Sequence, residues 1–106
     1  MLLLEKSTYY SVHQSETKRL FHVDFGQKVV KLNFCQMLAL REKVNAIQLD
    51  LLFDSEVNKH GLHMLTLCNN EHLFVLSIEQ VIDLVRLVHN SFAAMGLSQK
   101  YVPVSL

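Results

Sequence analysis

The feature that most constrains the fold of this chain is an internal repeat, in which one pattern of apolar residues occurs twice. Residues 20–45 align on residues 64–89 without a gap, at a constant offset of 44 residues. A repeat at a fixed offset indicates that one structural unit occurs twice, which local residue propensities do not reveal. We therefore predict a tandem duplication of one supersecondary unit. Four aligned pairs are identical, namely Leu32/Leu76, Gln36/Gln80, Leu40/Leu84 and Val44/Val88.

Both copies change their hydrophobic period at the same place, from alternation in two short strands to the spacing of an amphipathic helix. Asn33 stands just before the helical pattern of the first copy, and Gln36 follows three residues later. Ser77 and Gln80 hold the same places in the second copy. This pairing of residue types is the signature of a capping box, in which side chains satisfy the free amides of the first helical turn.

The caps and the periodicity predict helices over residues 34–46 and 78–95. Gly96 can take the left-handed conformation that ends the second helix. Before each helix, residues 25–28 and 69–71 offer the Gly and Asn residues that a hairpin turn needs. Each copy therefore has the pattern of a hairpin followed by a helix.

A third strand in each copy is an open alternative. Residues 47–53 alternate well enough to form a strand, with residues 9–13 as a counterpart, but the same stretch could extend the first helix by two turns. The polar residues 54–61 are expected to form an exposed loop. The placement of residues 1–18 and 97–106 is otherwise left open.

Composition indicates that residues 1–106 form a single domain. Half of the residues are apolar, and the chain has only three Gly and one Pro, which is typical of a continuous folded core. The predicted fold class is α+β, with hairpins rather than parallel crossovers. We expect an antiparallel sheet of four to six strands with two helices on one face, built from a tandem ββα or βββα duplication.

Charge and hydropathy exclude several classes of partner. Ten basic residues balance ten acidic ones, so no net field attracts a nucleic-acid backbone. No apolar run approaches the roughly 18 residues of a membrane span, and no export signal is visible. We therefore expect a cytoplasmic protein that binds neither nucleic acid nor membrane. Cys35 and Cys68 are expected to be reduced thiols.

His60 and His63 are the candidate metal ligands, because they lie three residues apart beside a loop. A helical zinc pair would need both imidazoles on one turn together with a positioned Glu, and this pattern lacks it. The other four histidines have no His at the repeat-related position. The pattern favours solvated histidines over a metal site, and no cofactor is expected.

Cys35 is the candidate nucleophile, since it falls in the first turn of the first predicted helix, where the helix dipole stabilises a thiolate. No base or oxyanion donor accompanies it, and its repeat equivalent is Glu79, a residue typical of an exposed turn. On the second helix, Glu79, Asp83, Arg86 and Asn90 recur on one face, which predicts a solvated stripe. The sequence therefore favours a protein without catalytic activity.

The Phe25-Gly26 turn and the Leu32-Asn33-Phe34 helix start resemble a group of small bacterial proteins of uncharacterised function. In that group an apolar strand ending in Phe-Gly, a second strand and a capped helix follow one another. The resemblance covers about the middle third of the chain and implies a fold without an activity. Some members carry a Cys-x-x-Cys before the Phe-Gly strand, but residues 11–19 contain no cysteine, so the zinc site that the resemblance implies is absent.

The two predicted sheet halves differ on the face that points away from the helices. In the first half this face is polar, whereas in the second half it is largely apolar, and an exposed apolar patch indicates a contact surface. We expect a homodimer, or docking onto another protein, through this face. Its predicted contact residues are Met64, Thr66, Leu73 and Val75, with Cys68 beside them.

Two alternatives to this interpretation are open. The N-terminal segment with Tyr9, Tyr10 and Val12 could fold back over the apolar face within one chain. The other alternative to a binding or assembly module is a small metal- or thiol-dependent protein that uses Cys35 or the His60 and His63 region.

Overall fold

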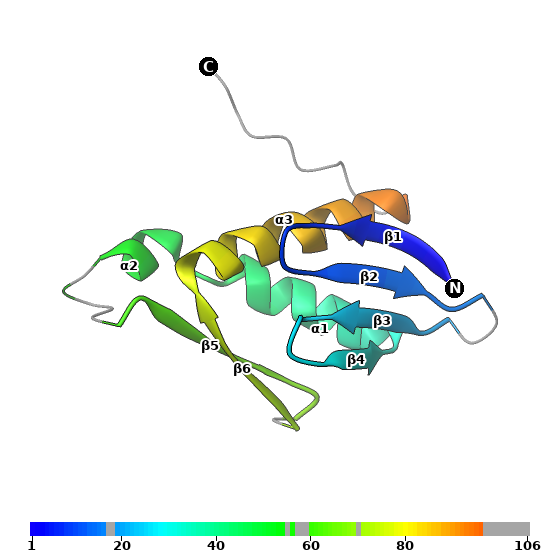
Figure 1. Cartoon of the computed structure of the whole chain (residues 1–106), viewed down its shortest axis with the longest axis horizontal. Helices are drawn as coiled ribbons and strands as arrows, with labels where there is room; N and C mark the ends of the chain where they lie inside the picture. Colours follow the sequence, from blue (N-terminus) through cyan, green and yellow to red (C-terminus); the bar gives the residue numbers. More distant parts are fainter. Residues whose placement is uncertain (17–18, 55, 57–59, 70, 97–106) are drawn as a thin grey trace, which may run out of the picture.

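A computed structural model describes residues 1–16, 19–54, 56, 60–69 and 71–96 of the chain. Its first layer is an antiparallel sheet, and the two long helices α1 and α3 cover one face of that sheet (Figure 1). The predicted α+β class is confirmed. The elements in chain order are β1 (Leu2–Lys6), β2 (Ser11–Gln14), β3 (Phe21–Asp24), β4 (Val29–Leu32), α1 (Phe34–Asn45), α2 (Leu49–Phe53), β5 (Leu62–Leu67), β6 (His72–Ser77) and α3 (Ile78–Ala94).

The six described strands form two sheets rather than one. Strands β1, β2, β3 and β4 lie in sequence order in a four-stranded sheet, and β5 pairs with β6 in a separate hairpin. In the larger sheet Phe21 pairs with Leu32 and Val23 with Val30, and all four side chains are buried. Because alternate residues of a strand point to opposite faces, this register directs one apolar face of the sheet onto the helices.

The β5–β6 hairpin adds its inner face to the same core. Leu65, Leu67, Phe74 and Leu76 are buried on that face. The ring of Phe74 stacks on the ring of Phe25, which follows β3, with centroids 4.2 Å apart. This stack fixes the hairpin against the end of the four-stranded sheet.

Both predicted capping boxes are present. The backbone amide of Gln36 donates to Asn33 Oδ1 at 2.8 Å, and the amide of Asn33 donates to Gln36 Oε1 at 2.9 Å. The amides of Gln80 and Ser77 make the same reciprocal bonds, at 3.2 and 2.8 Å. The helices that follow end one residue before their predicted limits, at Asn45 and Ala94.

The predicted turns use left-handed backbone where it was expected. Gly26 has φ +83° and its amide donates to Asp24 Oδ1 at 2.8 Å, which closes the β3–β4 hairpin. Gly96 has φ +76° just after α3. In the β5–β6 turn Asn69 has φ +55°, and so does Cys68, a residue type that seldom adopts this conformation.

The predicted strand at residues 47–53 is wrong, and so is the alternative of a longer first helix. Helix α1 ends at Asn45, and the separate short helix α2 follows. Leu52 interrupts the alternation that suggested a strand, and it is this residue that the fold buries, at 7% exposure. Burial of Leu52 therefore decides the local conformation, while Leu51 and Phe53 stay exposed.

The N-terminal residues build two strands, and only one of them was anticipated. The strand proposed at residues 9–13 begins at Ser11 as β2, and β1 pairs with it at the edge of the sheet. Neither strand has a counterpart among the described residues that follow α1, so the duplication stays a prediction. The structure does bury both members of the aligned pairs Leu32/Leu76, Leu40/Leu84 and Val44/Val88.

Candidate functional site

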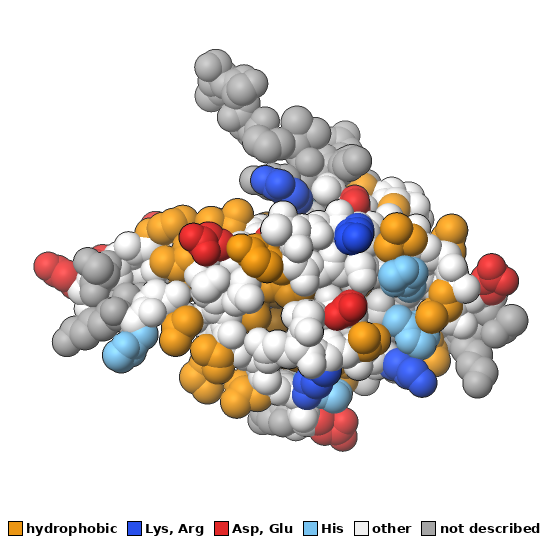
Figure 2. Space-filling model, in the orientation of Figure 1, with side chains coloured by type: hydrophobic (Ala, Val, Ile, Leu, Met, Phe, Trp, Pro, Cys, Tyr) orange, Lys and Arg blue, Asp and Glu red, His pale blue; other side chains and the backbone are white. Residues whose placement is uncertain are grey.

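The candidate interaction site is the outer face of the β5–β6 hairpin, hereafter the outer hairpin face, which carries the predicted contact residues. Met64 lies opposite Val75, and Thr66 lies opposite Leu73. Figure 2 shows hydrophobic side chains gathered over this hairpin at the lower left of the molecule. The apolar members are about half exposed: Leu62 48%, Met64 64%, Leu73 50% and Val75 44%. Thr66 is half-buried among them.

The exposure of this face follows from the burial of the other one. A strand has two faces, and a slip of one residue in the register would move every side chain to the opposite face. Since Phe74 and Leu65 belong to the core, Val75 and Met64 must point outward. The outer hairpin face is therefore a fixed apolar surface.

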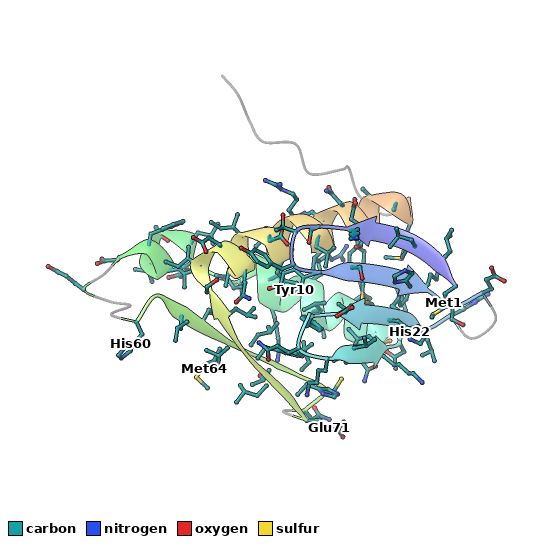
Figure 3. All side chains as sticks on the ribbon, in the orientation of Figure 1. Met1, Tyr10, His22, His60, Met64 and Glu71 are labelled. Carbon is teal, nitrogen blue, oxygen red and sulfur yellow. The ribbon has the colours of Figure 1, made fainter. Side chains whose placement is uncertain are left out.

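The N-terminal segment does not cover this surface, so that alternative is wrong. Tyr10 is buried instead against Phe25, with ring centroids 5.8 Å apart. Its hydroxyl donates to the carbonyl oxygen of Gln80 at 3.0 Å. Tyr10, just before β2, thus attaches the larger sheet to α3, away from the outer hairpin face (Figure 3).

The apolar surface continues from the hairpin onto α2. Leu51 and Leu62 line one hollow of about 400 Å³ together with the buried Leu52. Leu51 is 42% exposed, and Phe53 at the end of α2 is 58% exposed. The sequence did not predict that the apolar surface includes α2, because residues 47–53 were expected to form a strand.

A groove runs between α1 and β5, hereafter the α1–β5 groove. It consists of three hollows of about 460, 290 and 400 Å³. Lys43 lines the first two, and Ala46, Ile47 and His63 line the last two, so neighbouring hollows adjoin. The helix contributes mainly Cys35, Gln36, Ala39, Lys43 and Ala46, and the strand side contributes Leu62 to Asn69.

The two cysteines lie at one end of the α1–β5 groove, although 33 positions separate them in the sequence. Cys35 is exposed, as predicted, and Cys68 is half-buried. The side-chain amide of Gln36 donates to Cys68 Sγ at 3.6 Å. The sequence did not predict that the two cysteines lie close together, because Cys68 was expected on the apolar face of the sheet.

The histidines form no metal centre in the described residues, where no group of three or more His, Cys, Asp or Glu side chains could hold an ion. His60 is exposed before β5, and His63 is half-buried within it. His13 and His22 face each other across β2 and β3, a pairing that only the hairpin register could have revealed. His72 has a buried Nδ1 without a hydrogen-bond partner among the described atoms.

The interpretation of Asp83 as part of a solvated stripe is wrong. Asp83 is 8% exposed, and its Oδ2 accepts hydrogen bonds from Ser7 Oγ at 2.6 Å and from the amide of Tyr9 at 2.9 Å. It therefore anchors the β1–β2 turn on α3. Burial raises the pKa of the neighbouring Tyr10, and the negative charge of Asp83 raises it further.

Comparison with protein-family models, curated proteins and solved structures finds no match to this chain. The resemblance of the Phe25-Gly26 region to small bacterial proteins therefore stays a prediction. None of the described helices is long and apolar enough to cross a membrane.

Proposed function

We propose that this protein is a non-catalytic assembly module that forms a homodimer through the outer hairpin face. One observation supports the proposal: four half-exposed apolar side chains lie together on a hairpin whose opposite face is core. Exposed apolar patches of this kind mark contact surfaces in proteins. A two-fold dimer is the commonest assembly that covers such a patch with a copy of itself.

The size of the patch supports a dimer of modest affinity. Complete burial of a Val, Leu or Met side chain contributes about 1.5–3 kcal/mol, so completing a half-burial contributes about 1 kcal/mol. Eight such side chains in a symmetric contact contribute about 8 kcal/mol, and association costs about 4–15 kcal/mol. The gain from burial and the cost of association are therefore similar. We expect Leu51 and Phe53 on the adjoining α2 to add to the contact.

The carboxylate of Glu71 constrains how a second copy can lie on the outer hairpin face. His60 lies at the open end and Glu71 at the turn, with Met64 between them (Figure 3). A two-fold axis perpendicular to the strands places each Glu71 beside the His60 end of the other copy. An axis parallel to the strands would instead bring Glu71 against Glu71. The perpendicular axis keeps the two Glu71 carboxylates apart and is therefore favoured.

Light scattering at micromolar concentration tests the proposal, with a chain mass of 12.2 kDa as the reference. We expect a dimer that Val75→Lys dissociates without unfolding the chain. Val29→Lys is the matched control, because Val29 is a 55% exposed valine on β4, outside the outer hairpin face. A strictly monomeric wild-type chain would refute the homodimer, and a dimer that Val75→Lys leaves intact would refute the outer hairpin face as its interface.

The second candidate is a thiol- or metal-dependent protein, and the observation in its favour is that Cys35 and Cys68 line one hollow. His60 and His63 belong to the same candidate, at the other end of β5. Thiol titration and elemental analysis of the purified protein separate the two candidates. Stoichiometric metal, or a thiol that reacts far faster than a model thiol at neutral pH, would favour the second. In either case we propose a protein without a nucleic-acid partner, on the basis of its balanced charge. We also propose that it is cytoplasmic, because no export signal is recognisable in the sequence.

A further inference from the structure

The outer edge of β5 is an open β-strand edge. Within the described residues β5 pairs with β6 alone. The ammonium group of Lys43 donates to the carbonyl oxygen of Thr66, and also to Thr66 Oγ1 at 3.1 Å. The carbonyl of Thr66 therefore points away from β6. Because backbone groups alternate in direction along an antiparallel strand, Met64 also directs its amide and carbonyl groups to this edge.

This edge borders the α1–β5 groove along its whole length. Strand β5 has six residues, which at about 3.3 Å per residue gives a groove about 20 Å long. The opposite wall is one stripe of α1, formed by Cys35, Ala39, Lys43 and Ala46 at helical spacing. The small side chains of Ala39 and Ala46 leave room beside the strand, while Lys43 reaches across to Thr66 and Gln36 to Cys68.

The α1–β5 groove is devoid of acidic side chains. The chain has ten Asp and Glu residues, but none of them lines any of the three hollows. Lys43 is the charged side chain at the middle of the groove, and Thr66 is its partner across it. A ligand with negative charge near its centre would complement this lining.

We propose that the α1–β5 groove binds an extended acidic peptide segment of another protein, which pairs with β5 as a third strand. The backbone of the peptide replaces Lys43 at the carbonyl of Thr66, and an acidic side chain of the peptide takes up the released ammonium group. Its alternate side chains point toward Ala39 and Ala46. Strand addition of this type gains affinity from main-chain hydrogen bonds and specificity from the pockets for alternate residues.

This site differs from the homodimer contact in the groups it uses, which are the backbone edge of β5 rather than the outer face, although Leu62 and Met64 border both. The first test uses a fluorescent peptide of about seven alternating Val and Glu residues, a length that spans β5. We expect saturable binding with a Kd below about 1 mM by fluorescence anisotropy. A Val and Lys peptide should bind at least about fivefold more weakly, since it places like charge at Lys43.

A peptide of the same Val and Glu sequence with alternate amides N-methylated tests the strand pairing itself. It should lose measurable binding, because it cannot donate hydrogen bonds to the β5 edge. Equal binding of the methylated peptide, equal binding of the Val and Lys peptide, or no saturable binding of the Val and Glu peptide would each overturn the proposal.

Variants of the protein locate the site. Ala39→Trp fills the groove from an exposed helix position and should weaken binding at least about tenfold. Glu42→Trp is the matched control, because Glu42 is exposed on α1 but does not line the groove. Lys43→Ala should abolish the preference for a Val and Glu peptide over a Val and Thr peptide. Unchanged binding by Ala39→Trp would place the peptide elsewhere and refute the groove.

The two proposals fail independently. Val75→Lys should dissociate the homodimer and leave peptide affinity within about twofold, while Ala39→Trp should do the reverse. A Val75→Lys protein that loses peptide binding as well would show that the peptide occupies the outer hairpin face, which contradicts the groove.

Discussion

Replacement of Asp83 by Ala tests the attachment of the larger sheet to α3. The carboxylate accepts bonds from Ser7 Oγ and from the amide of Tyr9, and its side chain is 8% exposed. A hydrogen bond to a charged group contributes about 1.5–3 kcal/mol net, so the loss of two costs about 3–6 kcal/mol. The higher helix propensity of Ala offsets about 0.5 kcal/mol. We therefore expect Asp83→Ala to lower the free energy of unfolding by at least about 2.5 kcal/mol.

Urea titration, monitored by circular dichroism, measures the free energy of unfolding, and Glu79→Ala is the control. Glu79 is an exposed carboxylate in the first turn of the same helix, so its removal should cost no more than about 1 kcal/mol. Asp83→Asn should fall between the two, because its amide oxygen can still accept a bond from the Tyr9 amide. If Asp83→Ala lowers the free energy of unfolding no more than Glu79→Ala does, the Asp83 carboxylate is solvated and does not anchor the β1–β2 turn on α3.

The capping boxes and the buried tyrosine give two further predictions. Asn33→Ala and Ser77→Ala should each lower the free energy of unfolding by about 1 kcal/mol, as denaturant titration measures; a clear difference between them would question the registration of the two halves. Tyr10 has a raised pKa in the folded chain, so above its ordinary value of 10.0 the unfolded chain releases the proton first and stability falls as pH rises. Tyr10→Phe should reduce the difference in unfolding free energy between about pH 9 and about pH 11, and an unchanged difference would exclude Tyr10 as its source.

Local signals predicted the parts of the fold that local chemistry determines. The caps at Asn33 and Ser77 need only neighbours three residues away, and both formed as predicted. The turn at Gly26 was predictable because glycine readily adopts a positive φ, and Gly26 has φ +83°. Strand alternation also placed Met64 and Val75 on an exposed face, since their neighbours Leu65 and Phe74 belong to the core.

The errors have a common cause, which is contact between segments far apart in the chain. Asp83 has the sequence environment of a surface residue, and only the β1–β2 turn, more than 70 positions away, makes it a buried anchor. Leu52 is one apolar residue among several, and packing alone decided which of them became buried. The α1–β5 groove depends on the distance between a helix and a strand, which no periodicity encodes.

The attachment of the β1–β2 turn to α3 also has a consequence for synthesis. The hydrogen bonds of Ser7 and Tyr9 reach a residue made 76 and 74 positions later, so the N-terminal strands emerge from the ribosome long before their anchor exists. During that interval the edge strand β1 lacks α3, the helix that it contacts in the folded protein. An exposed edge of this kind is prone to pair with other chains. The nascent chain is therefore most vulnerable to aggregation just before α3 is translated.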